Sequence, residues 1–100
     1  MTDEEKRQQK ATLLLEYHEA EEDLKQLREK AARMAQPFLA VGDFLTRASR
    51  GQPRFGRDEG VRKSFEYMRP LEALALIDEI DAAHEKLADL GRRKAALGLP

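Results

Sequence analysis

Apolar residues recur at alternating spacings of four and three along the first half of the chain. The pattern runs without a miss through ten positions, here named the first apolar stripe: Leu13, Tyr17, Ala20, Leu24, Leu27, Ala31, Met34, Phe38, Val41 and Leu45. This heptad spacing keeps one face of an α-helix turned toward a partner helix. Thr2 followed by Glu5 fits a capping box at a helix start. The sequence therefore predicts a helical arm over about residues 3–48.

Pro37 falls inside the first apolar stripe. A proline in a helix interior removes one backbone hydrogen bond and clashes with the carbonyl four residues earlier, here that of Arg33. Either the helix bends at this point, or it ends near Gln36 and a second helix starts with Pro37 in its first turn. Because the apolar period continues unbroken, we expect a kink or a nearly collinear restart.

The second half of the chain carries two shorter patterns. Asp58 is a suitable N-cap, and Val61, Phe65 and Met68 follow it as a short apolar stripe. After Pro70 the pattern changes phase, which predicts a kink or restart, and a second apolar stripe follows at Ala73, Leu76, Ile80, Ala83, Leu87 and Leu90. The ending Leu97-Gly98-Leu99-Pro100 is typical of a helix terminator. This arm should span about residues 59–97.

The two arms are joined by a Gly- and Arg-rich joint at about residues 49–58. A chain of 100 residues is of ordinary size for one domain. Two long helices with a short connection pack most simply as antiparallel neighbours. We therefore predict a single all-α domain over residues 1–100, a long antiparallel helical hairpin kinked near Pro37 and Pro70.

The apolar surface is broader than two facing stripes require. Leu14 and Leu15 flank the first apolar stripe, and Leu39 and Phe44 lie off it further along; Leu74 and Ile77 flank the second. In an isolated hairpin these flanking side chains stay exposed, although full burial of a Leu or Ile is worth roughly 1.5–3 kcal/mol. We therefore expect a four-helix bundle or coiled-coil dimer, or binding to a partner protein's helix.

A homodimer is the favoured form of this association. The residues that we predict to carry the contact are apolar members of both stripes and their flanks: Leu13, Leu14, Tyr17, Leu24, Leu27, Met34, Phe38, Leu74, Leu76, Ile77, Ile80, Leu87 and Leu90.

The amino-acid composition makes several classes of function less plausible for this chain. Charged residues make up 37% of the chain but the net charge is only −1, so there is no overall attraction to nucleic acid or membrane. The absence of cysteine excludes disulfides and thiolate metal sites. The polar start MTDEEKRQQK lacks the apolar core of a secretory signal, and the apolar runs are too short to span a bilayer. We expect no membrane association and a cytoplasmic location.

The joint is the alternative functional site. Residues 47–63 contain six Lys or Arg against two acidic residues, and Phe55 stands among the arginines. Arginines interleaved with an aromatic residue can hold phosphates and stack on bases. The cations can equally pair with Asp43, Asp58, Glu59 and Glu66 in a solvated turn. The candidate polyanion-binding residues are Arg47, Arg50, Arg54, Arg57, Arg62 and Lys63.

Catalytic and metal chemistry has little support in the sequence. Asp81 and His84 share one helical face, but bundle metal sites need further inward-facing carboxylates, and none accompanies them. A third alternative is a metal-dependent all-helical hydrolase, because Glu19, Glu22, Asp23, Asp78, Glu79 and Asp81 are similar to the Mg²⁺-binding carboxylates of all-helical nucleotide pyrophosphohydrolases. No nucleophile motif or phosphate-binding glycine loop is present. We therefore predict a non-catalytic helical interaction module with no metal site and no cofactor.

Overall fold

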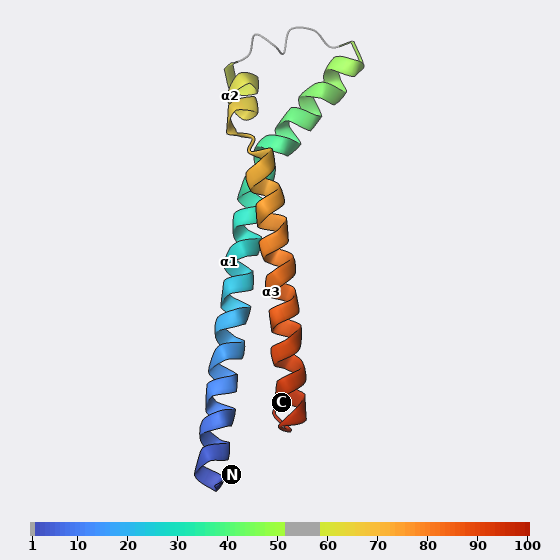
Figure 1. Cartoon of the computed structure of the whole chain (residues 1–100). Coiled ribbons are helices and arrows are strands. Elements are labelled where there is room, and N and C mark those ends of the chain that lie inside the picture. The colour runs from blue at the N-terminus through green and yellow to red at the C-terminus, as the bar shows by residue number, and fades with distance from the viewer. Residues whose placement is uncertain (1, 52–58) are drawn as a thin grey trace. The chain divides into compact units, whose positions relative to one another are not determined.

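The computed structural model of the chain describes residues 2–51 and 59–100. These residues form three helices, α1 (Asp3–Ser49), α2 (Glu59–Tyr67) and α3 (Pro70–Ala96), and contain no strand (Figure 1). The predicted fold class is confirmed: the chain is an all-α antiparallel helical hairpin. Its residues group into two compact units, unit 1 (Met1–Arg28 with Ile77–Pro100) and unit 2 (Glu29–Leu76).

Unit 1 is held together by the two apolar stripes. Leu13, Ala20 and Leu90 are buried in one cluster, against which further apolar side chains pack: Tyr17, Leu87, Leu97 and Leu99. The contacts run in opposite directions along the two helices, because Leu13 lines the same depression as Leu97 while Tyr17 lies beside Gly91. The α1 and α3 segments of unit 1 are therefore antiparallel, as the stripes predict.

Tyr17 packs against α3 within unit 1. A Cβ atom built on Gly91 would lie 3.8 Å from the Cε2 atom of Tyr17, so the ring rests against the one glycine of α3. The Nζ atom of Lys94 lies 3.9 Å from the centroid of the same ring. A cation over a ring face is attracted by the ring's negative quadrupole. One aromatic side chain thus contributes both apolar packing and a polar contact to the core.

Both outer helix ends have the capping groups that the sequence predicts. The Glu5 N–H donates to the Thr2 hydroxyl (3.2 Å), and the Thr2 N–H donates to the Glu5 carboxylate (3.4 Å), which completes a capping box. At the end of α3, Leu99 N–H donates to the Lys94 carbonyl and Gly98 N–H to the Ala95 carbonyl, both at 3.0 Å. With Gly98 at φ +69°, this is a Schellman motif.

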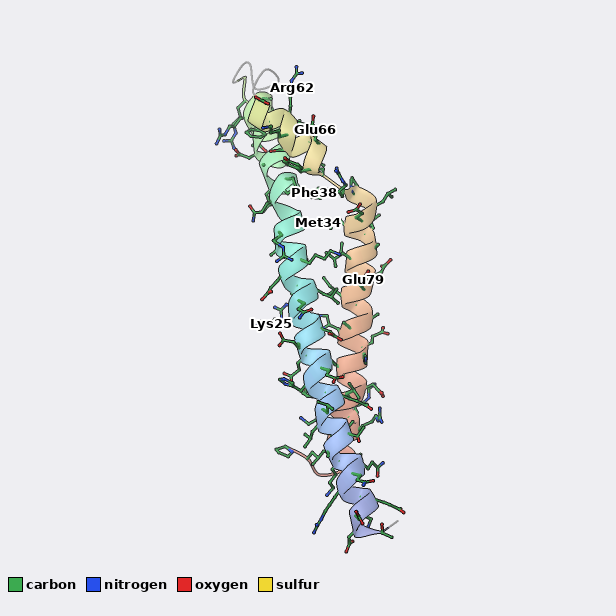
Figure 2. The ribbon with its side chains drawn as sticks, turned by 90° about the vertical axis from the view of Figure 1, so that its left-hand side faces the viewer. Lys25, Met34, Phe38, Arg62, Glu66 and Glu79 are labelled. Carbon is green, nitrogen blue, oxygen red and sulfur yellow. The ribbon has the colours of Figure 1, made fainter. Side chains whose placement is uncertain are left out.

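In unit 2, α1 continues through Pro37 as one helix to Ser49. The ribbon of α1 changes direction where its colour passes from teal to green (Figure 1), and a proline in a helix interior causes such a bend through a lost hydrogen bond and a clash. In Figure 2, Met34 and Phe38 lie on the side of α1 that faces α3, and both are half-buried. The first apolar stripe therefore keeps its orientation across the proline.

At Pro70 the chain restarts a helix instead of bending one. Helix α2 ends at Tyr67, and α3 begins at Pro70 after two non-helical residues. The Ala73 N–H donates to the Arg69 carbonyl (2.8 Å), so Pro70 is the first residue of the helix, where its missing N–H is not needed. The Arg69 guanidinium donates to the carbonyls of Glu66 and Met68. It thereby satisfies acceptors that the end of α2 leaves open.

Two positions differ from the periodic prediction. Phe65 is 50% exposed, whereas Ser64 is half-buried beside the buried Val61. Leu45, the last member of the first apolar stripe, is 60% exposed, although Val41 one turn earlier is buried. Periodicity states which side of a helix is apolar, but it cannot state where the covering element stops. The predicted N-cap Asp58 lies outside the described residues.

Gly91 in α3 and Gly98 just after it should respond in opposite directions to the same substitution. Gly91→Ala should raise the free energy of unfolding by about 0.5–1 kcal/mol, because alanine is the better helix former and the new methyl group has room against Tyr17. Gly98→Ala should lower it by about 1 kcal/mol, because alanine is strained at positive φ. Urea unfolding at one fixed protein concentration tests both, and equal signs would contradict the packing described.

Candidate interaction surface

Four of the predicted contact residues are already buried within the single chain. Leu13, Leu24, Leu76 and Leu90 each retain 6% or less of their surface in solvent. The other stripe members of the predicted set are half-buried: Tyr17, Leu27, Met34, Phe38, Ile80 and Leu87. These residues form the core of the chain's own helices. The surface left for a partner must come from other positions.

The flanking residues are exposed, as the sequence predicts. Leu14, Leu74 and Ile77 are 42%, 60% and 53% exposed, and Leu15 and Leu39 are exposed as well. Phe44 is the exception, since it is half-buried. A helix pair covers only the facing side of each helix, so these side chains remain in contact with water.

Most of the exposed apolar surface belongs to unit 2. Of the nine large apolar side chains that are exposed in the described part of the chain, six lie there. We name this set the unit 2 apolar residues: Leu39 and Leu45 on α1, Phe65 and Tyr67 on α2, and Leu71 and Leu74 on α3. Scattered exposed leucines are ordinary, so what distinguishes unit 2 is that it holds the larger share of the exposed large apolar side chains.

Leu71 and Leu74 lie on the side of α3 turned away from its own apolar stripe. Leu74 is two residues before Leu76, a rotation of about 200° around the helix axis. Leu71 is likewise two residues before Ala73 and is 82% exposed. A tighter pairing of the chain's own stripes therefore cannot cover them. Leu71 is not among the contact residues predicted from the sequence, although its place two residues before a stripe member was a usable signal.

A shallow depression forms in unit 2 beside Pro37. Its lining contains three cations and three apolar or aromatic side chains: Lys30, Arg33, Met34, Pro37, Tyr67 and Arg69. The depression has a volume of about 410 Å³ and opens widely to solvent. A small molecule is normally held in a cleft that encloses most of its surface. An open depression lined by both cations and apolar groups suits a side chain from another protein surface better.

The basic joint is partly neutralised by its own helices. Arg47 forms an ion pair with Asp43 (3.0 Å), and Lys63 forms one with Glu59 (3.7 Å). Both pairs are exposed and join residues four apart on one helix, a geometry that contributes about 0.3–0.5 kcal/mol. Arg50 is exposed, and Arg62 is exposed but engaged in a further interaction. Arg54 and Arg57 lie outside the described residues.

The histidines and acidic residues remain dispersed. His18, His84 and Asp81 are all exposed. Within residues 2–51 and 59–100, no three His, Cys, Asp or Glu side chains gather closely enough to hold a metal ion. Over the same residues, no helix combines the length and apolar character needed to span a bilayer. The most distinctive surfaces of the described chain are thus the unit 2 apolar residues and the depression beside Pro37.

Comparisons with protein-family models, with curated proteins and with solved structures give no match for this chain. The geometry and charge of its surfaces are therefore the basis for a functional proposal.

Proposed function

We propose that this protein is a non-catalytic helical interaction module that associates with a second helical surface, in the first place that of another copy of itself. The observation that supports the proposal is the exposure of large apolar side chains that the chain's own helices cannot cover. Leu71 and Leu74 are 82% and 60% exposed on the outer side of α3, and four further apolar residues of unit 2 are also exposed.

The free energy available from covering these side chains is large for a protein of this size. Covering a Leu or Phe side chain is worth roughly 1.5–3 kcal/mol. A small domain is stable by only about 5–15 kcal/mol in total. Burial of even part of the unit 2 apolar residues is therefore large in comparison. Two hairpins offer four helices, the number that makes a closed bundle, and two-fold dimers are the commonest symmetric assemblies.

If the chain self-associates through unit 2, light scattering behind a sizing column should give about twice the 11.4 kDa of one chain. Leu74→Glu should reduce this mass toward 11.4 kDa without loss of helicity, because it places a charge in the contact but not in the core. Ala88→Glu, an exposed change elsewhere on α3, is the matched control and should leave the mass unchanged. A wild-type monomer at high concentration would contradict self-association and leave only a foreign partner.

Leu24→Glu should behave differently from Leu74→Glu, because Leu24 is only 6% exposed within the chain. A carboxylate buried without a partner carries a desolvation cost of several kcal/mol. We therefore expect loss of helical circular dichroism at low temperature and a broad or absent melting transition. Retention of a wild-type melting temperature would contradict the placement of Leu24 in the core.

Polyanion binding by the basic joint is the second candidate, favoured by the concentration of positive charge in unit 2. Residues 29–76 contain nine Lys or Arg against six Asp or Glu, a net charge of +3. Phosphate contacts release counterions, so affinity for nucleic acid falls steeply as salt rises.

Under this second candidate, a fluorescent single-stranded oligonucleotide should bind far more weakly at about 200 mM salt than at about 50 mM. The combined change Arg54→Ala with Arg57→Ala should weaken binding further. Lys6→Ala with Arg7→Ala removes the same charge from exposed positions of unit 1 and serves as the control. Binding that responds to neither salt nor the joint variant would end this candidate.

A further inference from the structure

Charge is distributed unequally between the two units. Unit 2 carries +3, whereas unit 1 has nine Lys or Arg against thirteen Asp or Glu, a net charge of −4. The near-neutral total therefore conceals a chain with one acidic and one basic unit. Two copies attract each other most strongly when the acidic unit of one lies against the basic unit of the other.

One exposed line of residues on α1 carries this separation of charge. We name it the charged stripe: Leu15, Glu19, Glu22, Gln26, Lys30, Arg33 and Pro37. Its spacings are four, three, four, four, three and four, about 3.7 residues per turn, so it stays close to one side of the helix. Six of its members are exposed, and Pro37 is half-buried.

Most of the charged stripe points away from the chain's own helix pairing. Leu15, Glu19 and Gln26 each follow a member of the first apolar stripe by two residues, a rotation of about 200°. The same relation holds for Glu22 and Arg33, whereas Lys30 and Pro37 each follow a stripe member by three residues and lie at the edge of the pairing. This side of α1 is thus available to a second molecule while α3 stays in place.

The sequence of the charged stripe is self-complementary when two copies run antiparallel. With Gln26 at the two-fold axis, Glu22 of one copy faces Lys30 of the other, four residues from the axis on each side. Seven residues from the axis, Glu19 faces Arg33. Each pair occurs twice by symmetry. A parallel pairing would instead place Glu19 against Glu19 and Arg33 against Arg33, so that like charges repel.

In this antiparallel pairing, the apolar residue at one end of the charged stripe faces the apolar residue at the other end of the second copy's stripe. Eleven residues from the axis, Leu15 of one copy faces Pro37 of the other. Leu15 is 58% exposed, and Pro37 belongs to the depression whose lining also contains Met34 and Tyr67. The same lining contains the cations Lys30, Arg33 and Arg69. An exposed apolar side chain thus faces a depression lined by apolar groups and cations.

We propose that the occupant of the charged stripe is a second copy of this chain, docked antiparallel about a two-fold axis at Gln26. This inference rests on the proposed function, to which it adds the register of the self-association and a contact surface on α1 that is separate from the unit 2 apolar residues. The paired segments cover residues 15–37, a contact about 33 Å long at the rise of an α-helix. The contact is isologous, so it closes at two copies.

A cysteine at the two-fold axis tests the register directly, because the natural chain contains no cysteine. Gln26→Cys brings two thiols face to face, at a Cα separation close to the roughly 4.4–6.8 Å that a disulfide needs. Mild oxidation of dilute protein should convert most of the chains to a covalent dimer on a non-reducing gel. Lys25→Cys, at an exposed position about 100° from Gln26 around the same turn, should give at most a tenth of that rate. Equal rates, or no disulfide from Gln26→Cys, overturn the proposal.

Charge reversal tests the pairing without a covalent bond. Glu19→Arg alone and Arg33→Glu alone each set like charges against each other twice, and each should weaken dimerisation about tenfold at low salt. The combined variant exchanges the two charges and should restore the dissociation constant to within about threefold of the wild-type value. Glu21→Arg makes the same charge change on another side of α1 and should alter it less than about twofold. Sedimentation equilibrium measures all four variants, and failure of the combined variant to recover overturns the pairing.

The two proposals fail in different ways. A dimer that Leu74→Glu dissociates, but that shows neither the Gln26→Cys disulfide nor recovery by charge exchange, retains the proposed function and overturns the register. A disulfide and a charge exchange that behave as expected, with no effect of Leu74→Glu, support the register and assign the contact to α1 alone. A strictly monomeric wild-type chain overturns this inference and leaves only a foreign helix for the proposed function.

Discussion

Two helices that face each other can bury one narrow stripe each, and this limit shapes the protein. In unit 1 the pairing of α1 with α3 buries Leu13, Ala20 and Leu90 and half-buries their neighbours. No residue of the described chain has a fully buried large side chain, and none of its buried residues is polar or charged. The core is therefore thin. Apolar residues outside the two stripes cannot be buried within one chain, so they remain available to a partner.

Much of the fold could be predicted from the sequence because the capping residues and the spacing of apolar residues indicate the same helices. The capping box at Thr2 and Glu5 and the terminator at Gly98 are set by residues a few positions apart, so a single sequence suffices to find them. The heptad spacing likewise determined which side of α1 is covered, from Leu13 to Val41. Long, strongly periodic helices leave little freedom for an alternative.

Features that depend on neighbours distant in sequence were less readable. Period alone did not reveal that Ser64 is covered more fully than Phe65, or that the stripe of α1 is uncovered at Leu45. The sequence allowed either a bend or a restart at both prolines, and only the structure distinguishes the continuous helix at Pro37 from the break before Pro70. The capping of α2 by the Arg69 side chain depends on a rotamer that no short motif encodes. For the interaction surface, the sequence identified the flanking leucines but not the depression beside Pro37.

A heptad repeat by itself does not fix the alignment of two helices, because a slip of seven residues restores the same apolar pattern. The contact of Tyr17 with Gly91 removes this ambiguity. After a slip of seven residues in one direction the ring would meet His84, whose side chain occupies the space that glycine leaves open. After the opposite slip it would face Gly98, beyond the last residue of α3. The packing of the Tyr17 ring on Gly91, which has no side chain, therefore selects one alignment of the two helices from several that would bury similar apolar residues.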